Sequence, residues 1–211
     1  PQPPSEILID DTEDIQIDPA KKTILVVEDD EESLYIMKKY LGEDNYQIIV
    51  AKSGDGAAEK ALKYLPDVIT LDIMLPKKDG WEVLQELKRN PATKHIPVAI
   101  ISMIDNKKLG YSLGTSDYLV KPIEMKEFLD SVVRGVTRTR ARRALRQTHL
   151  RLQQQADELL ETQHIAAKES GRGGRTESQV FLDLTMVNIA SSLHDLLWLA
   201  GAPGTQAHPE G

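Results

Sequence analysis

Acidic residues follow two apolar runs of the sequence, and acids at such places can act as nucleophiles or metal ligands. Asp72 ends the run at 68–71, and Glu28-Asp29-Asp30 follow the run at 23–27. A carboxylate that lies where a buried strand reaches the surface is held rigidly but stays accessible to solvent. Each acid alone is more often a solvated surface residue, so only their joint occurrence with other groups predicts a site.

A lysine and a serine follow two further apolar runs. Lys121 comes after Tyr118-Leu119-Val120, and Ser102 comes after Ala99-Ile100-Ile101. If these runs are parallel strands, their C-terminal ends meet at one edge of the sheet, where open α/β sheets build their sites. We therefore expect Lys121 and Ser102 to lie near Asp72.

Three of the acids predict a metal site. Glu28, Asp29 and Asp72 would repel one another at one sheet edge unless a cation neutralised them. Oxygen ligands with room for water and phosphate oxygens suit Mg²⁺ or Mn²⁺, whereas Zn²⁺ usually requires His or Cys. We expect Asp29 and Asp72 as direct ligands, Glu28 as a ligand through water, and the Met74 backbone carbonyl as the remaining protein ligand.

The chemistry that such a set could perform is phosphoryl transfer to a carboxylate. With a metal shielding its charge, Asp72 could attack a phosphoryl donor and form an aspartyl phosphate. Lys121 would supply a cation, and Ser102 a hydroxyl, to the phosphoryl oxygens. These contacts would exist only after phosphorylation, so they could shift a conformational equilibrium. Tyr118 is the candidate for an aromatic residue whose burial changes in that shift.

The elements that must position these residues alternate between short apolar runs and amphipathic stretches. This pattern is typical of an α/β fold with a doubly wound parallel sheet covered by helices on both faces. Ser53 could cap the second helix, and Asp79-Gly80 could open the third. The strands are expected near residues 23–27, 47–51, 67–71, 97–101 and 117–120, and the helices near 31–41, 54–64, 80–89, 105–112 and from 124 to about 168.

The strand-end motifs resemble those of response-regulator receiver domains. Residues 24–30 are similar to the acidic first-strand motif, residues 71–76 with Asp79-Gly80 to the phosphoacceptor motif, and Lys121-Pro122 to the final motif. The resemblance covers about residues 23–136. It implies a flavodoxin-like fold with five parallel strands in the order 2-1-3-4-5.

The same resemblance implies a function in a two-component phosphorelay. The partner would be a histidine kinase or a phosphotransfer protein, and the domain would be a switch with slow autodephosphorylation rather than an enzyme with a diffusing substrate. Ser102 in place of the more usual Thr, and Glu28 in place of Asp, keep the required chemical groups. Short stretches such as 7–11 and 103–105 further resemble receivers of hybrid histidine kinases. This resemblance concerns only the kind of parent protein to which the chain could belong.

The rest of the chain predicts extensions on both sides of the domain. Residues 1–22 are rich in acids and proline and indicate a linker or loosely docked arm. Residues 137–170 are expected to be a helical extension with a weak coiled-coil seam, which would allow a homodimer. A Gly-rich break at 171–177, a helical segment at 178–200 and a disordered tail at 201–211 would follow. The seam comprises Leu145, His149, Leu152, Ala156, Leu159 and Gln163.

Composition restricts the class of protein. The 211 residues carry a formal net charge of −7 and include no cysteine, so a disulfide framework, a thiolate metal site and a cysteine nucleophile are excluded. The acidic balance argues against nucleic-acid binding. The sequence shows neither a signal peptide nor a run of roughly 18 apolar residues. We expect a cytoplasmic segment without membrane contact, although a longer parent protein could be tethered to a membrane.

Two alternatives belong to other functional classes. The Arg-rich run at 134–151 could bind DNA and make the protein a transcription regulator, but no base-reading fold follows it. A metal-dependent hydrolase with Asp72 as nucleophile would need a second acid–base carboxylate, which the motif around Asp72 lacks. The sequence allows either isomer at the Lys121-Pro122 bond.

Overall fold

The computed structural model of the chain describes residues 15–42 and 45–169, and within them strands and helices alternate as the apolar pattern predicts. The strands are β1 (Lys22–Val27), β2 (Tyr46–Ala51), β3 (Val68–Asp72), β4 (Val98–Ser102) and β5 (Asp117–Val120). The helices are α1 (Glu31–Leu41), α2 (Gly54–Tyr64), α3 (Gly80–Arg89), α4 (Lys107–Ser112) and α5 (Met125–Glu169).

All five strands pair in parallel and form one sheet with the order β2-β1-β3-β4-β5. The doubly wound fold and its strand order are thus confirmed. Because the strands are parallel, the residues that follow β1, β3, β4 and β5 all emerge at the same edge of the sheet.

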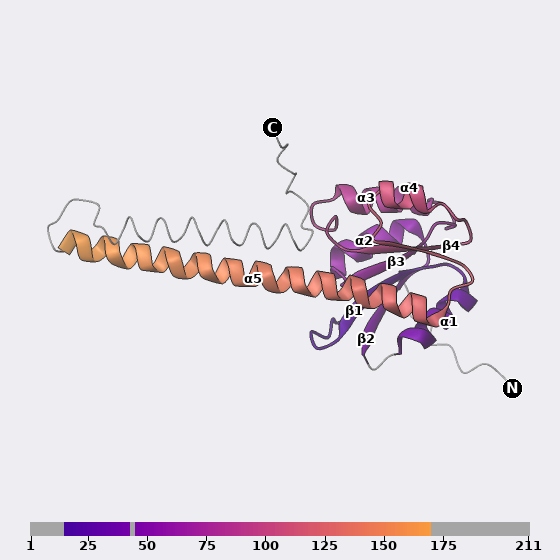
Figure 1. Cartoon of the computed structure of the whole chain (residues 1–211), viewed down its shortest axis with the longest axis horizontal. Coiled ribbons are helices and arrows are strands. Elements are labelled where there is room, and N and C mark those ends of the chain that lie inside the picture. The colour runs from indigo at the N-terminus through magenta and orange to yellow at the C-terminus, as the bar shows by residue number, and fades with distance from the viewer. Residues whose placement is uncertain (1–14, 43–44, 170–211) are drawn as a thin grey trace. The chain divides into compact units, whose positions relative to one another are not determined.

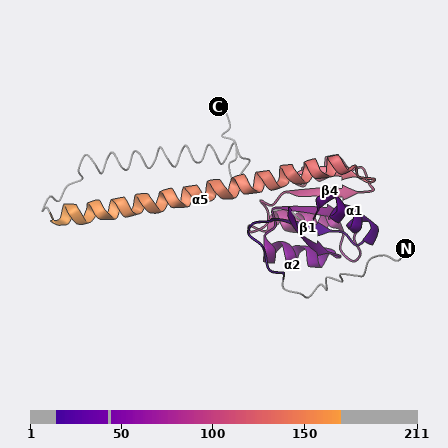
Figure 2. The same cartoon turned by 90° about the horizontal axis from the view of Figure 1, so that it is seen from below.

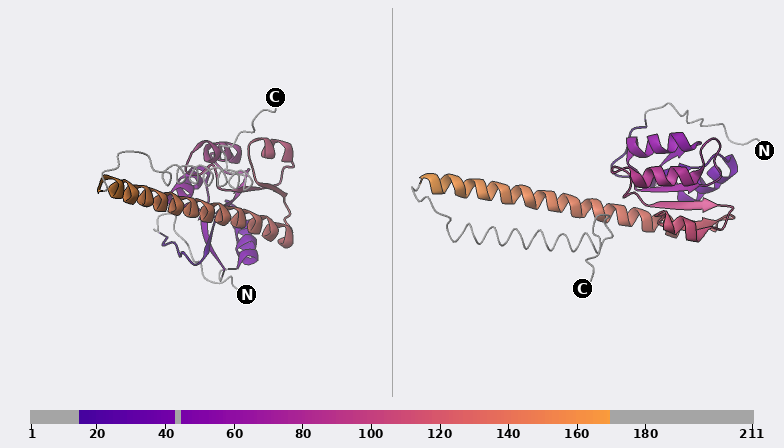
Figure 3. Two further views of the ribbon diagram at one scale, coloured as in Figure 1. Left: turned by 60° about the vertical axis from the view of Figure 1, so that its left-hand side comes forward. Right: turned by 90° about the horizontal axis from the view of Figure 1, so that it is seen from above.

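Two apolar layers hold the helices on opposite faces of the sheet (Figure 1). One layer joins β-strand residues such as Leu71 and Ile100 to α2 and α3, and the other joins residues such as Val26 and Ile101 to α1 and the first turns of α5. Figures 2 and 3 show the same layering from other sides. Successive strand residues alternate between the two layers, so β1, β3 and β4 are buried on both faces, as central parallel strands require. The edge strand β2 is only partly buried on one of its faces.

Polar side chains cap the first three helices. The Asp30 carboxylate accepts a hydrogen bond from Ser33 N at 2.8 Å and starts α1. Ser53 accepts from Gly56 N at 3.4 Å, and Asp79 accepts from Trp81 N at 3.0 Å. Each cap satisfies a backbone N–H that has no partner within its helix. The caps expected at Ser53 and Asp79 are therefore present.

The last residues of the expected N-terminal arm contact the sheet edge. Gln47 of β2 accepts a hydrogen bond from Asp18 N at 2.9 Å and donates one to the Gln16 carbonyl at 2.6 Å. Ile15 packs beside the apolar layer that includes α2. The part of the arm from Ile15 onward is therefore docked on the domain.

The chain divides into two compact units, Pro1–Thr139 and Arg140–Gly211. The described part of the second unit, residues 140–169, is helical and belongs to α5. Residues 1–14, the Gly-rich break at 171–177, the segment 178–200 and the tail 201–211 lie outside the described residues. Within the described ranges, none of the helices has both the length and the apolar character that crossing a membrane requires.

Candidate functional site

The strand register brings the strand-end residues together. Val27 of β1 lies opposite Leu71 of β3, so Glu28 and Asp72 leave neighbouring strands side by side. Asp72 itself is paired with Ile101, and the next strand pairing places Ser102 opposite Val120. The C-terminal ends of four strands thus supply one site, although the contributing residues are far apart in the sequence.

Lys121 lies between two acidic side chains. Its ammonium group is 2.6 Å from Asp72 Oδ2 and 2.7 Å from Glu28 Oε2. The carboxyl side chains are only 6% and 1% exposed, whereas the Lys121 side chain is 13% exposed. The backbone holds this lysine in place, because its N–H donates to the Ser102 carbonyl at 2.9 Å. The Lys121-Pro122 bond is cis. One cation is therefore shared by two carboxylates that the fold has largely removed from water.

Burial and charge shift the proton affinities of two of these groups. Burial, together with the charge of Asp72, raises the pKa of Glu28, and the hydrogen bond from Lys121 offsets only part of that rise. Burial alone would lower the pKa of Lys121, but its hydrogen bonds to Asp72 and Glu28 outweigh this effect and raise it. Lys121 therefore remains a cation at the centre of the site.

Backbone N–H groups orient the carboxylates. Met74 N donates to Asp72 Oδ1 at 2.9 Å, and Asp30 N donates to Glu28 Oε1 at 3.3 Å. Asp72 consequently binds a backbone amide with one oxygen and the Lys121 ammonium with the other. A carboxylate held at both oxygens has a defined direction of attack, which a nucleophile requires.

Ser102 and Tyr118 meet through the backbone of Ile104. The fully buried Ser102 hydroxyl accepts a hydrogen bond from Ile104 N at 3.1 Å. The Tyr118 hydroxyl donates to the Ile104 carbonyl at 2.5 Å and accepts from Asn106 N at 3.3 Å. The loop between β4 and α4 is thus bonded to both side chains that the sequence suggests as switch residues.

The expected metal ligands differ in burial. Glu28 and Asp72 are buried, while Asp29 is exposed. In residues 15–42 and 45–169, no three acidic or histidine side chains come close enough together to hold a metal ion. The donor types nevertheless fit a hard divalent cation, because Glu28 and Asp72 offer only oxygen atoms and together need positive charge.

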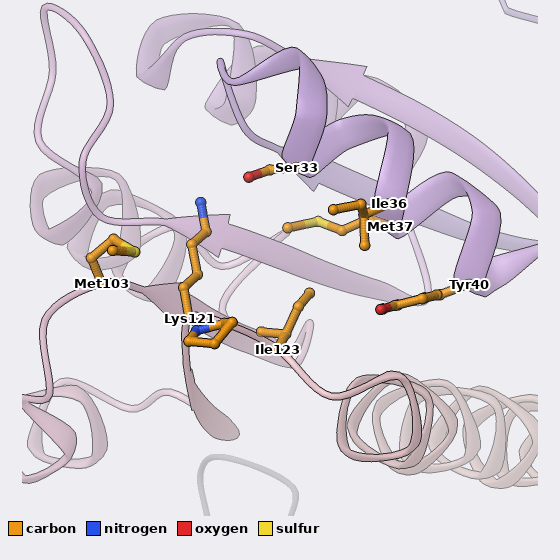
Figure 4. Close-up of a pocket in the computed structure, with 8 residues that line it drawn as sticks. Ser33, Ile36, Met37, Tyr40, Met103, Lys121 and Ile123 are labelled. Atoms are coloured by element: carbon orange, nitrogen blue, oxygen red, sulfur yellow. The ribbon is translucent and has the colours of Figure 1, made fainter.

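A groove lies beside Lys121 (Figure 4). It has a volume of about 370 Å³, and Figure 4 shows α1 side chains along one side and the segment after β5 along the other. Its lining is largely apolar, and its polar side chains are those of Ser33, Tyr40 and Lys121. The lining residues are Ser33, Ile36, Met37, Tyr40, Met103, Lys121, Pro122 and Ile123.

Some features of the site are not evident in the sequence. The second contact of Lys121, to Glu28, follows from the pairing of β1 with β3, and no local signal indicates it. The close approach of Gly80 to Asp72 could have been anticipated from the glycine that opens α3, since glycine permits such contacts. The ring contact between Trp81 and Tyr118 depends on helix packing.

Comparison with known proteins places residues 24–133 in a characterised family. These residues match the response regulator receiver domain. The response regulator PleD of Caulobacter vibrioides is 39% identical over 118 residues, which cover 54% of this chain and 26% of PleD. The chain thus spans about a quarter of that relative's length. These matches support the phosphoacceptor interpretation and do not favour the DNA-binding alternative.

Solved structures agree with the fold. A receiver domain of a Francisella response regulator has 31% identity and a TM-score of 0.53, covering 56% of this chain and 99% of its own. The receiver domain of a Pseudomonas aeruginosa sensor histidine kinase has 23% identity and a TM-score of 0.51, covering 56% of this chain and 98% of its own. That structure holds a magnesium ion in its active-site cleft, but at this identity the likeness concerns the fold alone.

Proposed function

Because the chain belongs, through residues 24–133, to the family of response regulator receiver domains, we propose that Asp72 is its phosphoacceptor. Receiver domains are signalling phosphoacceptors of two-component systems and interact with histidine kinases or phosphotransfer proteins. The observation that carries the assignment of Asp72 is its contact with Lys121 at the C-terminal end of a central strand. Glu28 is also buried and bonded to this lysine and to a backbone amide, but Asp72 is itself the last residue of β3 and is the more exposed of the two carboxylates, at 6% against 1%.

The proposed reaction transfers a phosphoryl group from a partner's phosphohistidine. An oxygen of Asp72 forms a bond to phosphorus while the phosphorus–nitrogen bond breaks, and the partner's imidazole leaves with the electron pair. The Lys121 ammonium, which neutralises Asp72 before the reaction, then donates to the new phosphoryl oxygens. Lys121 thus stays within reach of negative charge before and after transfer.

A divalent cation, Mg²⁺ or Mn²⁺, is part of this proposal. Asp72 and Asp29 would hold it directly, Glu28 through water, and the Met74 backbone carbonyl would complete the protein ligands. When bound, the ion shields the charge between the acceptor carboxylate and the incoming phosphoryl group. The buried pair Glu28 and Asp72, with one cation between them, supports the assignment, because a second cation would neutralise the remaining charge.

Ser102 and Tyr118 are the proposed switch. The Ser102 hydroxyl lies at the end of β4, next to the strand that carries Asp72. After phosphorylation, it would exchange its bond with Ile104 N for one with a phosphoryl oxygen. Charge-assisted bonds of this kind are worth roughly 1.5 to 3 kcal/mol each, which shifts a two-state equilibrium by about one to two powers of ten.

The groove beside Lys121 is the proposed docking place for the partner. Its occupant would be a helix that bears the phosphohistidine, with apolar side chains along α1 and the histidine at the lysine end. Continuity with the site supports this placement, because the lysine that contacts Asp72 also lines the groove. Two of its apolar lining residues, Ile36 at 39% and Met103 at 65%, are exposed to solvent.

The extension after the domain is proposed to dimerise. The seam residue Leu159 is 55% exposed, and residues 140–169 form a continuous part of α5. Paired helices would cover such residues.

A cytoplasmic location and a hybrid histidine kinase as parent protein are proposed as well, on the resemblance of the receiver motifs.

Phosphotransfer with radiolabelled partner kinase tests the assignment. Wild type should become labelled in a Mg²⁺-dependent manner, Asp72→Ala should remain unlabelled, and the label should be lost at alkaline pH, as an acyl phosphate is. Asp130→Asn, which changes an exposed carboxylate on α5, is the matched control and should label like wild type. Equal labelling of Asp72→Ala and wild type would refute the proposal.

A further inference from the structure

The loop between β3 and α3, residues 73–79, begins and ends at the acceptor carboxylate. At its start, Met74 N donates to Asp72 Oδ1 at 2.9 Å. At its end, Gly80 N donates to the Ile73 carbonyl at 3.0 Å, so the chain returns to the place where it left the strand. The path of this loop therefore determines where Met74 lies and how its amide holds Asp72.

The loop contains a tight turn that a residue with a Cβ adopts only at an energetic cost. Lys78 N donates to the Pro76 carbonyl at 2.9 Å, so the turn comprises three residues and is centred on Lys77. The φ angle of Lys77 is +70°, in the left-handed region that favours glycine. Such a conformation persists only where surrounding contacts hold it.

Lys78 supplies these contacts by joining the loop to two helices. Its ammonium forms an ion pair with Glu86 of α3 and lies 3.6 Å from Asp55 Oδ1 in the first turn of α2. Its backbone and Cβ also pack on α2, because a Cβ added to Gly54 would be 2.8 Å from Lys78 Cβ and 3.0 Å from its carbonyl oxygen. The Lys78 side chain is only 23% exposed as a result, although Lys77 beside it is exposed.

We propose that Lys78 is a positioning residue of the phosphoacceptor site. By joining the loop to α2 and α3 it keeps the turn at Lys77 closed, and the closed loop holds the Met74 amide on Asp72 and the Met74 carbonyl at the metal site. The inference rests on the proposed function, which makes Asp72 the acceptor and Met74 a metal ligand. Lys78 acts through the loop backbone, since its partners Glu86 and Asp55 lie on helices and are not among the proposed ligands.

The sign of the effect on Mg²⁺ binding separates positioning from bulk charge. Removing a lysine from the surroundings of a cation site takes away repulsion, so charge alone would strengthen Mg²⁺ binding. Loss of positioning would weaken it. Because the ion pairs of Lys78 are partly exposed, Lys78→Met should weaken Mg²⁺ binding about two- to fivefold. Lys78→Arg, which keeps the cation, should bind nearly as wild type.

Lys77→Met is the matched control for charge. It removes the same charge from the neighbouring residue of the same loop, and methionine meets the same constraint as lysine at a positive φ. Mg²⁺ binding to this variant should be unchanged or slightly stronger. Titration of the ¹⁵N-labelled full chain with Mg²⁺, followed by NMR at the Met74 amide, gives all these affinities.

A second measurement needs no metal. Hydrogen exchange of the Met74 amide reports its bond to Asp72, and the Ile69 amide, which donates to the Pro97 carbonyl at 3.0 Å, reports opening of the sheet. Lys78→Met should accelerate exchange at Met74 about two- to fivefold more than at Ile69. Equal acceleration at both amides would mean that Lys78 only stabilises the fold, and would overturn the inference.

Glu86→Gln tests the same link from α3 and leaves the lysine stem in place, so the test does not depend on one variant folding. It should also accelerate exchange at Met74, whereas Glu82→Gln, an exposed acid on the same helix, should not. In the double variant with Lys78→Met, the two effects should not add, because both remove one ion pair. Additive effects, or Mg²⁺ binding to Lys78→Met as tight as to Lys77→Met, would also overturn the inference.

Failure of this inference is distinguishable from failure of the proposed function. A wild type that neither becomes labelled in the phosphotransfer assay nor binds beryllofluoride, a mimic of the phosphoryl group, would refute the assignment of Asp72. Exchange at Met74 would still show whether Lys78 holds the loop. Conversely, a labelled wild type with identical Met74 exchange in Lys78→Met would retain Asp72 as the acceptor and remove Lys78 as a positioning residue.

Discussion

Gly80 approaches the backbone of Asp72 so closely that a Cβ on Gly80 would lie 2.3 Å from the Asp72 carbonyl oxygen. Its amide also donates to the Ile73 carbonyl at 3.0 Å. The first residue of α3 therefore lies directly against the peptide that carries the acceptor carboxylate, and the position of Asp72 depends on the absence of a side chain there.

Replacing Gly80 with alanine should destabilise the domain by at least about 1 to 3 kcal/mol, because the backbone of β3 cannot yield as a side chain could. Urea denaturation measures the loss. The matched control is Gly56→Ala in α2, where the new Cβ would meet Ser53 Oγ at 3.4 Å. Alanine favours helix over glycine, so this control should be neutral or slightly stabilising. Equal behaviour of the two variants would show that the close approach does not matter.

Lys121→Ala should lower stability most when no divalent ion is present. The substitution leaves two largely buried carboxylates without their cation, a loss of up to about 3 to 5 kcal/mol. Added Mg²⁺ should restore part of it by supplying positive charge to Asp72 and Glu28. The measurement is the unfolding free energy with and without Mg²⁺.

Lys52→Ala is the control for that comparison. It breaks an exposed ion pair with Glu31, whose side chain is 74% exposed, so it should cost no more than about 1 kcal/mol. The cost should be the same with and without Mg²⁺. If Lys121→Ala showed the same insensitivity to Mg²⁺, Glu28 and Asp72 would not be part of a metal site.

Ser102→Ala should weaken beryllofluoride binding by about one to two powers of ten, since it removes a hydroxyl that would bond to a charged group. Ser102→Thr should bind nearly as wild type, because it keeps the hydroxyl at the same place. Isothermal titration in Mg²⁺ gives both affinities. Ser102→Ala binding as tightly as Ser102→Thr would remove Ser102 from the proposed switch.

Asp117 should titrate below its ordinary pKa of 3.8. Burial alone would raise this pKa, but hydrogen bonds from the side chains of Arg134 and Ser131 and from Tyr118 N at 3.0 Å outweigh it and lower the value. The folded state thus binds the proton more weakly than the unfolded state. The resulting stability is fully present above about pH 3.8 and is lost as the pH falls through the lowered pKa.

Arg134→Ala should move the Asp117 pKa upward, as carboxyl carbon NMR would show. Because the Arg134 side chain is 62% exposed, the ion pair should contribute no more than about 1 kcal/mol at neutral pH. Denaturation at neutral pH should therefore reveal a small difference between the variant and wild type. An unchanged Asp117 pKa in Arg134→Ala would assign the lowered value to Ser131 and Tyr118 N instead.

Leu152→Glu should abolish a dimer formed through the seam, because a charge at a seam position would be buried against its own copy. Sedimentation equilibrium of the full chain gives the mass. Gln153→Glu is the control, since this exposed neighbour lies off the seam and should leave the mass unchanged. A wild type that remains monomeric at high concentration would exclude dimerisation by this route.

Local patterns in the sequence determined the order and approximate bounds of the elements. Alternating apolar runs and amphipathic stretches reflect which side chains a buried strand or a half-buried helix can accommodate, so they can be recognised without knowing what packs where. The same logic identified Asp72, Lys121 and Ser102, because each follows an apolar strand and parallel strands end at one edge. The helix caps at Ser53 and Asp79 are also local, since each cap bonds a backbone amide two or three residues ahead.

Only the tertiary structure decided how these residues meet. Lys121 reaches both Glu28 and Asp72 because β1 lies beside β3, a pairing between segments more than forty residues apart in the chain. The direction of the Ser102 hydroxyl, the cis bond at Lys121-Pro122 and the enclosure of Tyr118 by Trp81 and Gly110 depend on loop paths and helix packing. Such contacts are set by the summed packing of distant segments, so no local spacing encodes them.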